Sequence, residues 1–214
     1  MRTSPLHFEI SANVERWGML HDMSVPLSFK REGADAVLGL ADASAFARCG
    51  FKGSSAPAWL ASLGFPVPER HNLWVALPGG GVVGRLGHTE FFVEDGLNGS
   101  AVDSISASFD RAPHDVYIVP RHDAAILVTG TRALELLAQT CNVNFGAIRP
   151  GDCQLVMTSM IGVSVLVIPE VRSRFRVWCD PTFGPSLWRA LFEIAEELGG
   201  GPIGLARLFP GIDA

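Results

Sequence analysis

The chain has 214 residues, of which 48% are hydrophobic and 18% are charged. This composition excludes a disordered protein and is enough for one large domain or two smaller units that bury a substantial core. The net charge is −5, and the lysine and arginine residues are scattered singly along the chain. The phosphate backbone of a nucleic acid is therefore not an expected partner.

The cysteines, the histidines and the N-terminal segment bear on compartment and metal binding. No C-x-x-C pair and no H-x-x-x-H spacing occurs, so we expect free, buried thiols and no metal site. The N-terminal segment has acidic residues and no long apolar run, which predicts neither a signal peptide nor a membrane partner. A reducing cytoplasm is the expected location. The cysteines are Cys49, Cys141, Cys153 and Cys179.

The first helix that the sequence predicts covers Ser55–Leu63. Ser54 or Ser55 is expected to supply the N-cap oxygen, Pro57 lies in the first turn, and Gly64 ends the helix. Its apolar residues recur every three or four positions, so one face of the helix must pack against a core.

Short apolar or β-branched runs follow, separated by Pro, Gly, Asn and Asp, and they predict strands. Runs of this length with helices between them are typical of an α+β fold in which helices cover one face of mostly antiparallel sheets. The predicted strands are Leu73–Leu77, Val82–Leu86, Phe91–Val93, Val116–Val119, Ala125–Thr129, Gln154–Thr158, Val163–Ile168 and Phe175–Cys179.

The last predicted helix begins near Pro185 and ends at the glycines Gly199–Gly201. Leu187, Leu191 and the apolar residues in register with them form one face, and the charged residues form the other.

A weak internal repeat joins the two halves of the chain. The segment around Gly53 has the same form as the segment around Gly130, 77 residues later: a strand, a glycine, a polar residue and a helix with inward-facing Ala and Leu. This pattern predicts two pseudo-symmetric α+β halves within one compact unit, residues 1–112 and 113–214. The alternative is that strand-glycine-helix turns are common in α+β proteins, so that the match reflects no repeat.

The order of these motifs resembles the glycine cleavage T protein family. In the first half, Gly39–Ser44 matches that family's G-[LV]-x-D-x-S motif, and Gly53, Ala56 and Trp59-Leu60 match its G-x-x-A-x-x-[FW]-L motif, before a glycine-led strand pair. The second half matches the family's later strands, its G-V-P-V segment and its last helix. The matching stretches are Ala125–Val128, Gly162–Val165, Phe175–Val177, Leu187-Trp188 and Gly200–Leu205.

The resemblance implies a T-protein-like folate-binding fold without the C-terminal barrel of the full-length T proteins. In aminomethyltransferases a central channel of this fold holds tetrahydrofolate, and in size and pattern the chain is most similar to the sarcosine oxidase gamma-subunit-like group. The implied function is that of an aminomethyltransferase-like protein of one-carbon or methylamine metabolism. The alternative is a non-catalytic, gamma-like subunit of a heteromeric amine oxidase or dehydrogenase. The expected interface anchors are Trp17, Met19, Met23, Trp74 and Phe183.

Two positions separate this chain from the active members of that family. The resemblance places one carboxylate just after Gly80–Val83, where this chain has Gly84-Arg85, and another at the position of Arg176. Because an arginine offers only donors and a fixed positive charge, a site with these residues prefers a small anion to the donor edge of a pterin.

The ligand-binding residues predicted on this basis are Arg85, His88 and Arg176, and no catalytic residue is assigned. The ligand is expected to be a small anionic molecule or folate. The alternative for Arg176 is that it is one of the alternating polar residues of a half-exposed strand and faces solvent.

Overall fold

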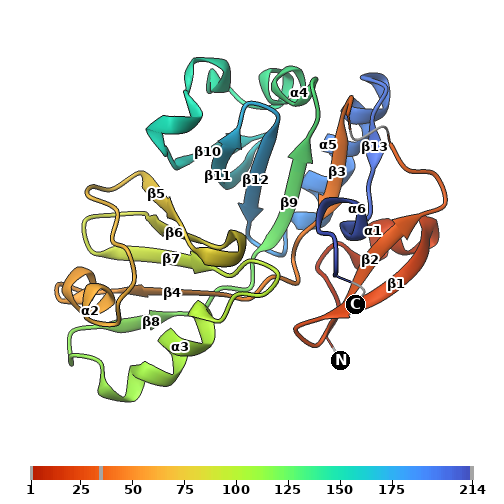
Figure 1. Ribbon diagram of the computed structural model, residues 1–214. Helices are drawn as coiled ribbons and strands as arrows, with labels where there is room; N and C mark the ends of the chain where they lie inside the picture. Colours follow the sequence, from red (N-terminus) through yellow and green to blue (C-terminus); the bar gives the residue numbers. More distant parts are fainter. Residues whose placement is uncertain (1, 34–35, 213–214) are drawn as a thin grey trace. The chain divides into compact units, whose positions relative to one another are not determined.

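The computed structural model describes residues 2–33 and 36–212, and it contains two compact units (Figure 1). The N/C unit consists of Met1–Ala45, Asp123–Asp152 and Val156–Ala214. The middle unit consists of Phe46–His122 with Cys153–Leu155. Helices and mostly antiparallel sheets occur in both units, which confirms the predicted α+β class. The repeat halves 1–112 and 113–214 stay a prediction.

The middle unit is a five-stranded antiparallel sheet in the order β5-β6-β7-β4-β8, with two helices on one face. Phe51 and Phe91 stack on that face with ring centroids 5.4 Å apart, and they form the core with Trp59 and Ile105 from the helices. The elements are β4 (Arg48–Lys52), α2 (Ala56–Ser62), β5 (Leu73–Ala76), η2 (Pro78–Gly80), β6 (Val82–Arg85), β7 (Glu90–Glu94), α3 (Ala101–Ser108), η3 (Phe109–Arg111) and β8 (Tyr117–Val119).

The N/C unit has a two-stranded sheet and a six-stranded sheet in the order β10-β11-β12-β9-β3-β13. Inward residues of the larger sheet pack against the apolar faces of α4 and α5. The helices are α1 (His7–Ile10), η1 (Ser11–Asn13), α4 (Ala133–Thr140), η4 (Phe145–Ala147), η5 (Pro150–Asp152), α5 (Gly184–Glu197) and α6 (Leu205–Leu208). The strands are β1 (Val14–Leu20), β2 (Met23–Phe29), β3 (Gly39–Asp42), β9 (Ala124–Thr129), β10 (Val156–Met160), β11 (Val163–Val171), β12 (Arg174–Cys179) and β13 (Gly201–Pro202).

Each unit contains the same chain path. One runs β4-α2-β5-β6-β7-α3 and the other runs β9-α4-β10-β11-β12-α5. The strands of the first path lie in the order β5-β6-β7-β4, and those of the second lie in the order β10-β11-β12-β9. In each sheet the first strand of the path is thus placed beside the last, and all neighbouring pairs are antiparallel. The two paths are therefore equivalent in connectivity.

The turn between the first strand and the first helix is built alike in both paths. Gly53 and Gly130 have positive φ angles of 142° and 117°. The N–H of Gly53 donates to the carbonyl of Thr89 just before β7, and the N–H of Gly130 donates to the carbonyl of Ser173 just before β12. Both glycines also lie against the carbonyl of another segment, so that a Cβ on Gly53 would come within 1.7 Å of the Asp115 oxygen. Both turns therefore need a residue without a Cβ.

Two local predictions need correction. The N-terminus of α2 has no side-chain cap from Ser54 or Ser55; instead the Asp115 carboxylate accepts hydrogen bonds from the Ser54 hydroxyl and, at 2.8 Å, from the Ser55 N–H. These bonds, the one from the Ser54 hydroxyl foremost, lower the pKa of Asp115. The strand predicted at Gln154–Thr158 begins at Val156, because Gln154 belongs to the middle unit and bridges to Leu73.

None of the described helices combines the length and the hydropathy needed to cross a bilayer.

The glycine turns give a direct stability prediction. Gly53→Ala and Gly130→Ala should each cost about 3 kcal/mol or more, because a Cβ adds a clash with a carbonyl to an unfavourable φ angle. Gly64 is the matched control, since its φ is +83° but no atom lies within 4 Å of the added Cβ. Gly64→Ala should cost about 1 kcal/mol. Urea unfolding followed by circular dichroism measures all three, and equal costs would contradict the proposed close approach.

Candidate functional site

Arg85 ends β6 in the middle unit, and its guanidinium group is held by backbone carbonyls. Nε and Nη2 donate to the carbonyl of His88 at 3.2 and 2.6 Å. Nη1 donates to the carbonyls of Pro68 and Glu69, both at 3.0 Å. The group also lies 5.6 Å from the centroid of the Phe91 ring. These contacts use four of the five N–H donors of the guanidinium group, and none of them neutralises its charge.

His88 lies in the turn between β6 and β7, and its side chain is exposed. Its ring meets that of His71 at a centroid distance of 4.7 Å and an interplanar angle of 62°. Arg85 and His88 are thus neighbours within the middle unit, whereas Arg176 belongs to the N/C unit.

Arg176 lies in the middle of β12 and is only 7% exposed, so the alternative that it faces solvent is wrong. Its Nε is 2.5 Å from Oε1 of Glu170, while Nε of Arg174 is 3.0 Å from Oε2 of the same carboxylate. Arg174 also lies 5.2 Å from the centroid of the Phe209 ring. One carboxylate on β11 therefore forms ion pairs with two arginines on β12.

A β-bulge places Glu170 at this position. Pro169 pairs with Phe175, and Val171 pairs with Arg174, so that Glu170 is the extra residue between two ladder positions. Such a residue is released from regular pairing, and its side chain takes a new direction. A proline inside a strand often marks a bulge, so Pro169 is the sequence signal that could have revealed this carboxylate.

Three other carboxylates, those of Asp42, Glu94 and Asp95, are buried. Oδ1 of Asp42 accepts the Ser44 N–H at 3.0 Å. Glu94 lies 2.9 Å from Nε of Arg48, with both side chains almost fully buried. The carboxylate of Asp95 accepts the N–H groups of Ala101 and Val102 at 2.9 and 3.2 Å and so caps α3. In these contacts each acid orients backbone or pairs with a base.

The thiols show no sign of a nucleophile. The four cysteines are free, and all except Cys153 are buried. Burial is the main cause that raises the pKa of both Cys49 and Cys179 to about 12, so these thiols stay protonated at neutral pH. Within residues 2–33 and 36–212, no group of three or more His, Cys, Asp or Glu residues is placed to hold a metal ion.

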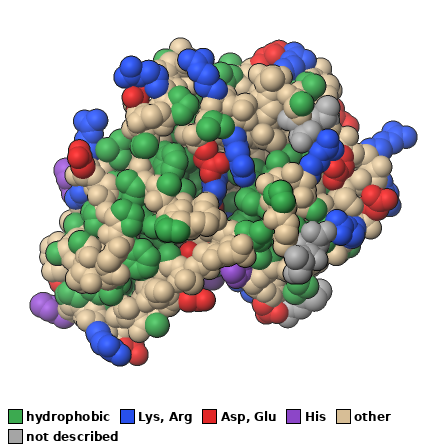
Figure 2. Space-filling model, in the orientation of Figure 1, with side chains coloured by type: hydrophobic (Ala, Val, Ile, Leu, Met, Phe, Trp, Pro, Cys, Tyr) green, Lys and Arg blue, Asp and Glu red, His purple; other side chains and the backbone are tan. Residues whose placement is uncertain are grey.

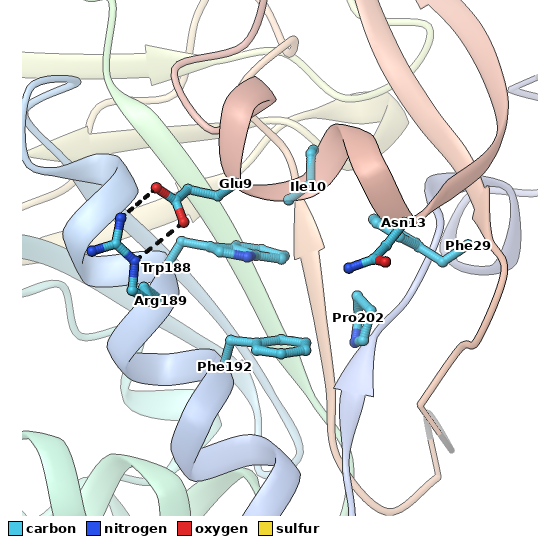
Figure 3. Close-up of a pocket in the computed structure, with 8 residues that line it drawn as sticks. All are labelled: Glu9, Ile10, Asn13, Phe29, Trp188, Arg189, Phe192 and Pro202. Atoms are coloured by element: carbon cyan, nitrogen blue, oxygen red, sulfur yellow. Dashed lines mark hydrogen bonds and ion pairs between the residues drawn. The ribbon is translucent and has the colours of Figure 1, made fainter.

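A groove lies beside α5 in the N/C unit, with about 350 Å³ of space that opens to solvent (Figure 3). Trp188 and Phe192 project from the same side of α5 toward Asn13 and Pro202. At one side Arg189 bonds to the Glu9 carboxylate, with Nη2 to Oε1 at 2.6 Å. Ile10 and Phe29 complete the walls of the groove. The sequence predicted the helix but not this groove, because these wall residues lie far from α5 in the sequence.

Comparison with known proteins places the fold. No protein-family model matches the chain, and no curated protein matches it in sequence. A chain of the heterotetrameric sarcosine oxidase from Corynebacterium sp. U-96, solved in complex with pyrrole 2-carboxylate, is 18% identical with a TM-score of 0.68. The alignment covers 94% of this chain and 97% of that chain.

The glycine cleavage system aminomethyltransferase T from Bartonella henselae is 15% identical with a TM-score of 0.67. The alignment covers 96% of this chain, which spans 60% of the length of the B. henselae chain. Likenesses at this level of identity establish the fold alone. The chain therefore has the T-protein-like α+β fold that its sequence motifs predicted.

Proposed function

We propose that this chain is a non-catalytic subunit of a heteromeric amine oxidase or dehydrogenase in one-carbon or methylamine metabolism. The observation that carries the proposal is the setting of Arg176. The position that aligns with a pterin-binding carboxylate of the T proteins holds a buried arginine bonded to Glu170.

Transfer of an aminomethylene carbon to a pterin needs carboxylates that orient the amine and accept from the pterin's donor edge. Arg85 and Arg176 cannot accept a hydrogen bond. Glu170 brings a carboxylate next to Arg176, but both of its oxygens lie against arginine nitrogens. These contacts favour a structural role for the residues and speak against the transfer reaction.

A partner chain is supported by the heterotetrameric state of the Corynebacterium oxidase and by apolar side chains at the surface of this chain. Figure 2 shows hydrophobic side chains at the surface in view, with lysine and arginine scattered among acidic residues. Phe8 is 92% exposed. Of the expected interface anchors, Met19 and Phe183 are exposed and Trp17 is half-buried, but Met23 and Trp74 are buried and cannot contact a partner.

The subunit proposal is tested by purifying the chain, with a tag, from the cells that produce it naturally. We expect it to elute above the 22.9 kDa of a monomer and to carry a flavoprotein in a fixed ratio, seen as flavin absorbance that follows the protein through a second column. A 22.9 kDa monomer that transfers an aminomethyl group to tetrahydrofolate would contradict the proposal.

A second candidate function is the binding of a small anion or folate in the middle unit by Arg85 and His88, with Arg176 in the N/C unit as a separate candidate. The observation that favours it is that Arg85 bonds to backbone carbonyls and not to any carboxylate among the described residues, and keeps one N–H donor. The similarity to aminomethyltransferase T makes tetrahydrofolate the folate to test.

Calorimetric titration with tetrahydrofolate and with citrate tests this second candidate. If either arginine binds the ligand, its replacement in Arg85→Ala or Arg176→Ala should weaken binding about tenfold, the loss expected for one charge-assisted hydrogen bond. Arg149→Ala is the matched control, because the Arg149 side chain is 81% exposed and forms an ion pair with Asp152, three residues away. Folate binding that both variants leave unchanged would rule out this role of the arginines.

A further inference from the structure

We propose that the groove beside α5 binds a small planar ring that carries a carboxylate group. The proposal rests on the walls of the groove and on the donors at its rim, and it does not depend on the proposed subunit function.

The walls suit a flat, apolar group. Trp188 and Phe192 are four residues apart on α5, so their attachment points are about 6 Å apart along the helix axis. Figure 3 shows both side chains pointing into the groove, where Pro202 and Phe29 line the far side. Trp188 and Phe29 are each only 3% exposed, so the apolar contact for a planar ring comes mainly from Phe192 and Pro202, which are half-buried.

The rim supplies hydrogen-bond donors. Arg189 donates through Nε and Nη2 to the two oxygens of Glu9, at 3.3 and 2.6 Å. Within the part of the chain that the structure describes, Nη1 of Arg189 makes no hydrogen bond, and its side chain is 61% exposed. The side-chain amide of Asn13 and the indole N–H of Trp188 are likewise unbonded among the described residues.

These groups select an anion over a cation. Among the described residues that line the groove, Glu9 is the carboxylate, and it already accepts two bonds from Arg189, so it has little capacity left to hold an ammonium group. Glu193, on the same helix, also interacts electrostatically with Arg189. The free guanidinium edge carries positive charge and presents its N–H groups to a carboxylate in a charge-assisted geometry. In a ring with a short carboxylate arm, the ring would contact the apolar walls and the carboxylate would accept hydrogen bonds from the donors at the rim.

The test uses three probes that differ in one property each. Indole-3-acetate has a planar ring and a charge, indole-3-acetamide has the ring without the charge, and cyclohexylacetate has the charge without a planar ring. The signal is the indole N–H resonance of Trp188 in the ¹⁵N-labelled protein, assigned with Trp188→Phe. We expect saturable shifts with indole-3-acetate and at least about fivefold weaker binding of the other two probes.

Two substitutions at the rim should act in opposite directions. Arg189→Gln removes the charged donor and should weaken binding of indole-3-acetate about tenfold. Glu9→Gln removes the negative charge and one of the two acceptor oxygens that hold Arg189, and should tighten binding about threefold. Arg149→Gln, at an exposed arginine elsewhere on the N/C unit, should change binding less than twofold.

Thermal unfolding of each variant shows that it remains folded. Equal binding of the acid and the amide would overturn the proposal, as would Arg189→Gln and Glu9→Gln changing affinity in the same direction. Absence of any saturable shift with all three probes would also overturn it, and would leave the groove as a surface for another protein chain.

Discussion

The contact on which this account depends is the one between the buried guanidinium group of Arg176 and the carboxylate of Glu170. An arginine keeps its charge when it is buried, so it must meet an acceptor inside the protein or destabilise the fold. The bulge in β11 brings Glu170 to that position, and Arg174 takes the second oxygen of the same carboxylate. The strand, the bulge and both arginines are thus parts of one arrangement.

This arrangement bears on function because an arginine in place of a carboxylate cannot accept a hydrogen bond from a ligand. A T-protein-like fold supports transfer chemistry only where side chains accept from the pterin and the amine, because fold and function are separable. At the two positions where the resemblance implies carboxylates, this chain has arginines: Arg85 bonds to three backbone carbonyls, and Arg176 forms an ion pair with an acid from the next strand. These two settings are the basis of the proposal that the chain is a non-catalytic subunit.

The sequence predicted the elements whose signals are local. The helix at Ala56–Ser62 and the long helix α5 follow from apolar periodicity and from terminal Pro and Gly, and the paired glycines mark both strand-to-helix turns. The hairpin of β1 and β2 was missed because β1 has no alternating pattern and β2 contains Pro26. Helix α3 was missed because it is rich in serine and is capped by Asp95, a residue outside the helix.

The candidate sites were harder to predict, because their residues meet only through the tertiary fold. Arg85 and Arg176 were identified from their positions in motifs, but a motif position does not reveal the acceptor that a side chain finds. Glu170 lies near Arg176 through a strand bulge, and the groove beside α5 joins that helix to segments from both ends of the N/C unit. Contacts of this kind have no local periodicity in the sequence.

The most direct measurement is a double-mutant cycle at this ion pair, with Arg176→Met, Glu170→Leu and the combined variant compared by urea unfolding. Glu170→Leu removes the carboxylate from the buried Arg176, so the account predicts a loss of about 3 kcal/mol. Arg176→Met leaves Glu170 paired with Arg174 and should cost about 1 kcal/mol, and the combined variant should recover much of the loss seen in Glu170→Leu. If Arg176→Met alone leaves stability unchanged while it alters the binding of folate, Arg176 serves a ligand and the structural account is contradicted.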